Sequence, residues 1–186
     1  IKHSKGRFIA FLDSDDIWKP QFLELSLQTH YKDRPGLTHA PFYRFYYYKE
    51  KFIGQEYLPP KIVNTKNILR RNYMLLSTVV VDTEVIGKFT FPNLRPEDYF
   101  LWINLVKKNI YSKSIESTQA YSRISKGQRS SNKLKSLFRL RKFYFNNPEL
   151  NFVMKIFYFF SWIFENLKIR FAKRFILQEK NHREIF

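Results

Sequence analysis

Apolar residues occur in short runs along the chain, and these runs predict strands that alternate with helices. Residues 8–12 are five consecutive apolar side chains between a glycine and a group of carboxylates, which is typical of a short buried strand. Residues 77–81 predict a second strand, and residues 110–121 a last strand region. The order of these segments favours an α/β fold.

Helical segments lie between the predicted strands. Pro20 precedes apolar residues at helical spacing, so we expect a helix from there to about residues 33–36. Another helix is expected to open at Pro96 and to carry Trp102 and Leu105 on its apolar face. The other expected elements are extended structure over 37–48 with a turn at 49–51 into a further strand, a short helix over 66–72, a polar loop over 125–133, and helices over 134–174 with a break near 146–148.

Three carboxylates, Asp13, Asp15 and Asp16, follow the first predicted strand directly. Ligands of open α/β sheets bind beyond the carboxyl ends of strands. Like charges held together cost free energy unless a cation lies near, so the loop predicts a divalent metal site. The alternative is a solvated acidic turn in which one aspartate caps the next helix. An EF-hand is excluded, because Ile17 and Trp18 stand where that loop needs an oxygen ligand and a glycine.

A second carboxylate pair, Glu97 and Asp98, falls in the first turn of the helix that opens at Pro96. Negative charge is favoured there by the helix dipole, and this alone would explain the pair. Together with a metal loop, however, an ionised Asp98 is suited to act as a general base.

The formal charge of +17 on 186 residues predicts attraction to polyanions. Basic and aromatic side chains concentrate between residues 126 and 186, which fits the surface of an anionic membrane or a helix buried in a partner. The longest apolar stretch, 152–164, is shorter than the roughly 20 residues that a membrane-spanning helix needs. The chain has no cysteine, which excludes disulfides and thiolate metal sites.

Two sequence motifs together resemble family 2 of the inverting glycosyltransferases. The first is residues 4–16, followed by Trp18 and Pro20, and the second is residues 95–99, followed by Trp102. Either motif alone would be moderate evidence, but here they occur in the family's order and at its spacing. The match covers about residues 1–133 and is similar to bacterial enzymes that build lipopolysaccharide or capsule.

This resemblance implies a partial GT-A fold, Rossmann-like with a mixed sheet, followed by C-terminal helices. Residues 1–133 would be the C-terminal part of the catalytic domain, and residues 134–186 a basic aromatic tail. The family carries further strands ahead of this point, so the resemblance also implies a truncated chain that by itself binds donor poorly and transfers slowly or not at all. The expected partners are a nucleotide-sugar donor, a glycan or lipid-linked acceptor, Mg²⁺ or Mn²⁺, and the inner face of the bacterial cytoplasmic membrane.

The resemblance also assigns roles to individual residues. Asp15 would bind the metal, with Asp13 close to it and to the donor ribose, and Asp98 would be the catalytic base. Arg123 would help to bind the donor diphosphate, although Ser122 stands where the family often has tyrosine. Supporting or acceptor-binding roles fall to the remaining site residues, Glu97, Trp102 and Ser77.

Two rival functions come from other classes of protein. A basic nucleic-acid-binding module would explain the positive charge, but its phosphates would be repelled by both carboxylate groups, so no nucleic acid is expected as a partner. A phosphatase of the haloacid dehalogenase type also begins with a strand and an Asp-x-Asp pair. That pattern needs Thr or Val two residues after the second aspartate, and Ile17 stands there with Asp16 before it.

Overall fold

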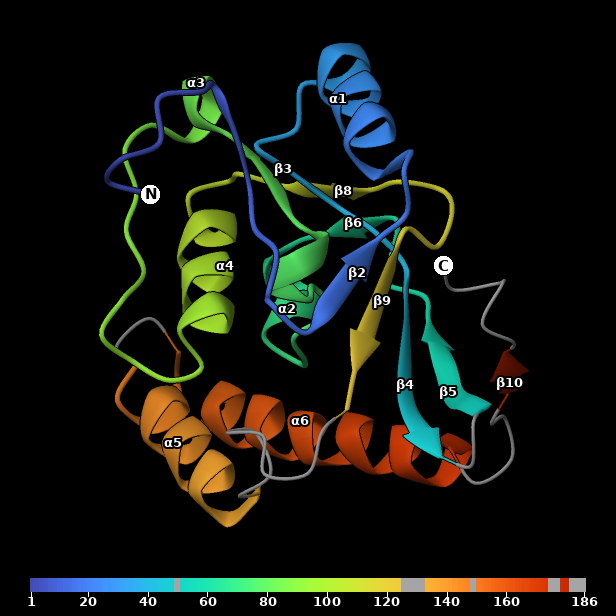
Figure 1. The fold of residues 1–186 in the computed structure, drawn as a ribbon. Coiled ribbons are helices and arrows are strands. Elements are labelled where there is room, and N and C mark those ends of the chain that lie inside the picture. Colours follow the sequence, from blue (N-terminus) through green and yellow to red (C-terminus); the bar gives the residue numbers. More distant parts are fainter. Residues whose placement is uncertain (49–50, 125–132, 148–149, 174–177, 181–186) are drawn as a thin grey trace.

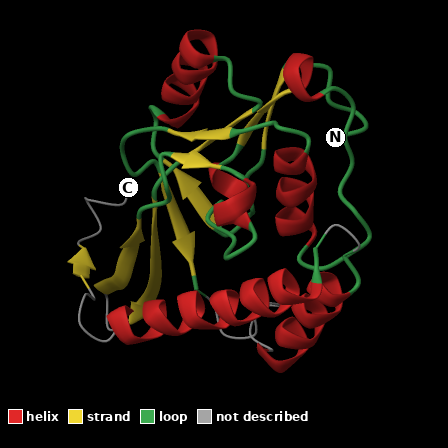
Figure 2. Cartoon of the chain, turned by 180° about the vertical axis from the view of Figure 1, so that it is seen from behind, coloured by secondary structure: helices red, strands yellow, loops and turns green. Residues whose placement is uncertain are grey.

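Two mixed sheets of five strands each form the frame of the protein in the computed structural model (Figure 1). The structure describes residues 1–48, 51–124, 133–147, 150–173 and 178–180. Figure 2 shows from behind how helices surround the strands. The helices are α1 (Phe22–Asp33), α2 (Thr65–Ile68), α3 (Thr83–Ile86), α4 (Glu97–Lys107), α5 (Lys133–Phe145) and α6 (Phe152–Lys173), together with the short 3₁₀ helix η1 (Leu76–Thr78).

The first sheet carries the strand that leads into the carboxylate loop. Its strands, in spatial order, are β1 (Phe8–Ala10), β7 (Val80–Asp82), β3 (Leu37–His39), β8 (Ser112–Ser114) and β6 (Ile62–Val63). Only β3 and β8 pair in parallel. Strand β1 was expected to be buried, but it is the edge strand of this sheet and its three residues are half-buried.

The second sheet begins directly after that loop. Its strands, in spatial order, are β10 (Gln178–Lys180), β5 (Lys51–Tyr57), β4 (Phe42–Tyr48), β9 (Ala120–Arg123) and β2 (Asp16–Trp18). Strands β4 and β9 pair in parallel and the other neighbours are antiparallel. The chain thus leaves the first sheet at β1 and enters the second at β2, so the carboxylate loop joins the two sheets.

The structure corrects three expectations about strands. Each of the regions 37–48 and 110–121 contains two strands that belong to different sheets, and Pro41 separates the first two because proline lacks an amide donor. The expected strand over 77–81 begins as η1, where the Thr78 hydroxyl donates to the Leu75 carbonyl at 2.7 Å and so competes with strand pairing. The polar strand β10 was not expected.

Helices α1, α4, α5 and α6 lie where the sequence predicts them, whereas α2 ends at Ile68, short of the predicted residue 72, and α3 was not expected. Helix α1 ends at Asp33, where Arg34 adopts a left-handed backbone with φ 48°, and α4 begins after Pro96. The break between α5 and α6 is also confirmed, and part of the polar loop over 125–133 lies outside the described residues.

The main hydrophobic core lies between the first sheet and α4, with Trp102 fully buried in it. Helix α5 adds Leu140 and Tyr144 to this core, and Tyr99 from α4 donates its hydroxyl to the Ile68 carbonyl at 2.7 Å. The C-terminal helices therefore pack on the same core as the two motifs.

We predict that His39 makes stability depend on pH. Its Nε2–H donates to the Pro60 carbonyl at 3.0 Å, its Nδ1 accepts from the Ser112 hydroxyl at 2.6 Å, and burial lowers its pKa from 6.5 to about 4. Between pH 7 and pH 5, His39 therefore becomes protonated in the unfolded chain but stays neutral in the folded chain. The free energy of unfolding should fall by about 2 kcal/mol over this interval because of His39.

Denaturant unfolding of the wild type and of His39→Gln at both pH values measures the contribution of His39 to the pH dependence of stability. The variant should lose less stability than the wild type over this interval, and His3→Gln at an exposed position is the control. An identical pH dependence in His39→Gln and the wild type would contradict the prediction.

Candidate active site

Ser77 fixes the carboxylate loop in place. Its hydroxyl oxygen accepts the backbone N–H of Asp13 at 3.1 Å, and its carbonyl accepts the indole N–H of Trp18 at 2.6 Å. The same hydroxyl also hydrogen-bonds the Asp16 carboxylate. Asp13 and Trp18, at the two ends of the loop, are therefore both hydrogen-bonded to one fully buried residue.

Asp16 is the inward-facing carboxylate of the loop. It is half-buried, and it is hydrogen-bonded by the hydroxyls of Ser77 and Ser122. Burial raises its pKa above the ordinary range, and the negative charges of Asp15 and Asp13 act in the same direction. Ser122, at the position where the sequence departs from the family's pattern, thus has a structural part in holding the loop.

Arg123 lies beside the same loop. Strand β9 pairs antiparallel with β2, so that Ser122 stands opposite Asp16. Arg123 is the next residue along β9, and it is exposed. The register therefore places Arg123 at the end of β9 next to the loop, on the side of Asp15.

Asp98 occupies the first turn of α4, as the sequence predicts, and is half-buried. Desolvation is the largest effect on this carboxyl and raises its pKa, with the nearby charge of Glu97 adding to the rise. The amide of Asn72 donates to Asp98 Oδ2 at 3.2 Å, and the backbone N–H of Tyr99 also donates to the carboxylate. A carboxylate of raised pKa, held in one orientation, is a better proton acceptor than one in water.

The segment from Asn72 to Ser77 connects the two carboxylate groups. Asn72 binds Asp98 at one end, and Ser77 binds the loop at the other. Asn72 is itself fixed, because its Oδ1 accepts the backbone N–H of the buried Met74 at 3.1 Å. Sequence reasoning missed Asn72, since a lone asparagine in a polar stretch carries no motif.

The expected supporting residues divide into two kinds. Trp102 is fully buried, and its ring lies edge-on to Phe11, with centroids 6.4 Å apart, at the end of the segment that leads into the loop. It therefore supports the loop from within the core. Glu97 is half-exposed beside Asp98 and adds negative charge to that end of α4.

Asp13 and Asp15 are the carboxylates of the loop that could hold a metal ion. Among the described residues, no group of three or more His, Asp or Glu side chains is arranged to hold a metal ion. Asp16 faces Ser77 and Ser122, which leaves two aspartates. Magnesium is often held by one or two carboxylates together with substrate phosphates, so these residues fit a metal shared with a diphosphate better than a closed protein cage.

Comparison with known proteins places the chain in a family. Residues 1–84 match the family described as Glycosyl transferase family 2. The chain is 35% identical over 141 residues to the UDP-Glc:alpha-D-GlcNAc-diphosphoundecaprenol beta-1,3-glucosyltransferase WfaP of Escherichia coli, covering 75% of this chain and 54% of that protein. It is 30% identical over 181 residues to an uncharacterized glycosyltransferase of Haemophilus influenzae, covering 93% and 68%. The chain thus spans about half the length of the E. coli relative.

The fold also has a counterpart among solved structures. The structure of S. aureus TarS 1-349 in complex with UDP-GlcNAc superposes with a TM-score of 0.57 at 16% identity, covering 87% of this chain and 49% of that one. The architecture is therefore that of the GT-A glycosyltransferases, with C-terminal helices, as expected. The chain belongs to glycosyltransferase family 2.

We predict that Ser77→Ala loosens the carboxylate loop. The substitution removes the acceptor of the Asp13 N–H and one hydrogen bond to the half-buried Asp16, so the free energy of unfolding should fall by about 2–3 kcal/mol. Denaturant unfolding measures the loss. The control is Ser14→Ala at an exposed position of the same loop, which should remain close to the wild type. Equal stability of the two variants would contradict the role of Ser77.

Proposed function

We propose that this chain belongs to a metal-dependent inverting glycosyltransferase, which moves a sugar from a nucleotide-diphosphate donor to a hydroxyl of a lipid-linked acceptor during surface polysaccharide synthesis. The observation that carries the proposal is the segment 72–77, which holds an exposed carboxylate loop at one end and a desolvated carboxylate at the other. The names of the E. coli relatives, which record a UDP-Glc donor and a diphosphoundecaprenol acceptor, support it.

The donor side of the proposed site is the loop between the two sheets. Asp13 and Asp15 would hold Mg²⁺ or Mn²⁺, and the Arg123 guanidinium would add positive charge near the donor diphosphate. The metal, when bound, neutralises the charge that develops on the departing nucleoside diphosphate. Ser77 and Ser122 keep Asp16 turned inward, so that the loop presents two carboxylates to the donor.

The acceptor side is built around Asp98. Its carboxylate takes the proton from the acceptor hydroxyl while that oxygen attacks the anomeric carbon. The new glycosidic bond forms on the face opposite to the departing diphosphate, whose bond to the same carbon breaks, so the configuration inverts. Asn72, through Oδ2, and the backbone N–H of Tyr99 hold the carboxylate in one orientation.

The rival functions explain less of the structure. Nucleic-acid binding uses the positive charge but leaves both carboxylate groups without a purpose. A phosphatase of the haloacid dehalogenase type uses the loop but not Asp98. The family relationship supports neither of them.

We further propose that α6 lies on an anionic membrane surface. Tyr158, Phe159 and Trp162 pack toward the core, and the opposite face exposes apolar side chains at helical spacing. This exposed stripe consists of Val153, Phe157, Phe160, Phe164 and Leu167.

Cations border the exposed stripe of α6. The Arg70 guanidinium lies 5.3 Å from the Phe157 ring centroid, and Lys168 Nζ lies 4.6 Å from that of Phe164. Aromatic side chains beside cations suit the headgroup region of anionic lipid. Within the part of the chain that the structure describes, no helix is long and apolar enough to cross a membrane.

We predict that Asp98→Asn removes the base while leaving the donor site intact. Transfer by the complete protein as the cell makes it should fall by about a hundredfold to ten-thousandfold, and donor affinity measured by calorimetry with Mn²⁺ should change little. Because burial raises the pKa of Asp98, the acid limb of the wild-type profile of kcat against pH should lie above the ordinary range for aspartate.

Glu116→Gln, at an exposed carboxyl away from both groups, is the matched control and should transfer normally. If Asp98→Asn instead lost donor affinity and kept its turnover, the assignment of the base would be wrong.

We predict that the double variant Phe160→Ser, Phe164→Ser weakens membrane binding at least tenfold, because both rings are more than half exposed on the stripe. Co-sedimentation with phosphatidylglycerol vesicles, at low and at high salt, measures the binding. Leu23→Ser on α1, which lies at the opposite end of the molecule in Figure 1, is the control. Equal binding of both variants and the wild type would contradict a membrane face on α6.

A further inference from the structure

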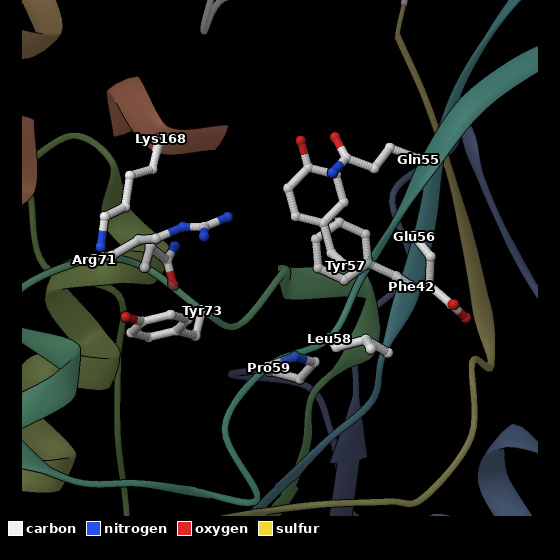
Figure 3. Close-up of a pocket in the computed structure, with 10 residues that line it drawn as sticks. Phe42, Gln55, Glu56, Tyr57, Leu58, Pro59, Arg71, Tyr73 and Lys168 are labelled. Atoms are coloured by element: carbon white, nitrogen blue, oxygen red, sulfur yellow. The ribbon is translucent and has the colours of Figure 1, made fainter. Parts of the chain in front are cut away.

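A pocket of about 240 Å³ opens between the second sheet, the segment 71–73 and α6 (Figure 3). Figure 3 shows Arg71 and Lys168 on one side of it and Tyr57 and Gln55 on the other. Its size is at the small end for pockets that enclose a ligand, which suits one sugar ring or a phosphate group. None of these four residues belongs to either of the two sequence motifs.

Glu56, Lys168 and Arg71 are the charged residues that line this pocket. Glu56 accepts from the Thr118 hydroxyl, Lys168 pairs with Glu165 at 3.6 Å, and Arg71 lies against two tyrosine rings.

Arg71 is half-buried, and its guanidinium carbon lies 5.6 Å from the Tyr57 ring centroid and 5.3 Å from that of Tyr73. None of the ion pairs between described residues involves it. Burial lowers the pKa of Arg71, yet a guanidinium keeps its charge at physiological pH. The aromatic rings orient this charge without neutralising it, and the Glu165 carboxylate attracts it without forming an ion pair with it, so the pocket suits an anion.

The neighbouring strands contribute polar atoms that no other described residue satisfies. Gln55, which lines the pocket, stands opposite Arg44 in the pairing of β4 with β5. Gln55 Oε1 and Arg44 Nε are both buried and have no hydrogen-bond partner among the described residues. Buried polar atoms are normally paired, and Gln55 lines the pocket, so a hydroxyl or amide donor of a ligand there would supply the partner that Gln55 Oε1 lacks.

The pocket lies on the acceptor side of the proposed site. Asn72 lines it and donates to Asp98 Oδ2 at 3.2 Å. None of the residues that line the pocket comes from the carboxylate loop or from the end of β9. A ligand here is therefore next to the residue that orients the base, and apart from the residues that would bind the donor.

The pocket also connects with the apolar stripe of α6. Lys168 lines the pocket and lies over the ring of Phe164, which belongs to the stripe. Phe42 and Tyr57 form a flat aromatic wall, stacked 4.9 Å apart at an angle of 2°. The sugar of a lipid-linked acceptor would thus lie against the flat aromatic wall and its phosphate near a cation. Its lipid would lie along the apolar stripe of α6.

We propose that this pocket binds the phosphate-bearing sugar of a lipid-linked acceptor, with Arg71 as the partner of the phosphate. The inference rests on the proposed function, because it takes Asp98 as the group that the acceptor hydroxyl must reach. Arg71 acts here as a binding and positioning residue: it holds the phosphate so that the sugar hydroxyl faces Asp98. A planar guanidinium suits a phosphate because it can donate two parallel hydrogen bonds.

Ligand binding to the complete protein tests this assignment without requiring turnover. The probes are N-acetylglucosamine 1-phosphate, N-acetylglucosamine and inorganic phosphate, titrated calorimetrically into the wild type, Arg71→Gln and Arg71→Lys. Arg71→Gln should weaken the sugar phosphate about tenfold to a hundredfold, since it removes hydrogen bonds to a charged group. It should not change the affinity for the unphosphorylated sugar or for a nucleotide-sugar donor. Arg71→Lys keeps the positive charge but cannot donate two parallel hydrogen bonds, so it should recover part of the affinity.

Lys66→Gln removes one positive charge from an exposed position on α2 and is the control for the general effect of charge. If the wild type binds the sugar phosphate more tightly than inorganic phosphate, this would support a pocket that contacts both the sugar and the phosphate. The assignment would be overturned by equal losses for the phosphorylated and unphosphorylated sugar, by equal losses in Lys66→Gln and Arg71→Gln, or by a loss confined to the nucleotide-sugar donor. These outcomes are independent of Asp98→Asn, whose failure would overturn the catalytic proposal alone.

Discussion

The arrangement of this site depends on one buried hydroxyl. Ser77 accepts from the backbone of Asp13, hydrogen-bonds the Asp16 carboxylate and holds Trp18 through its carbonyl. Three aspartates in four positions repel one another, and without such an anchor the loop would relax into solvent. Five residues earlier in the chain, Asn72 holds Asp98. One short segment thus sets the positions of two groups of like charge, which is the geometry that a two-sided transfer site requires.

Burial gives the carboxylates of the site different properties. Asp16 faces inward onto two serine hydroxyls, while Asp13 is exposed at the surface. Asp98 is desolvated and has a raised pKa, which suits a group that must take up a proton and release it again. A basic chain surrounds this acidic site, with a formal charge of +17. Substrates that carry phosphates would be attracted by the whole molecule and oriented by a few local cations.

Local signals in the sequence predicted the elements that bear the two motifs. The apolar run before Asp13, the proline that precedes α1 and the carboxylates that open α4 are patterns within a few residues, and each was found where expected. The division into two sheets was not predicted, because it depends on pairing between distant segments such as β2 with β9. The parts played by Asn72 and Arg71 were missed for the same reason. Each depends on what lies across from the residue in the fold, and a lone asparagine or arginine carries no pattern that reveals it.

In the proposed mechanism, a donor loop and a general base act in one site for direct displacement at an anomeric carbon. Its most direct test is the configuration of the product, followed by proton NMR of the anomeric signal as the complete protein transfers sugar from a donor of known anomeric configuration. We expect the first product to have the configuration opposite to that of the donor, because the proposed base, Asp98, would activate the acceptor for attack on the face away from the diphosphate. A product that keeps the donor's configuration would contradict the account, since it would require a second displacement in which Asp98 is not the base proposed here.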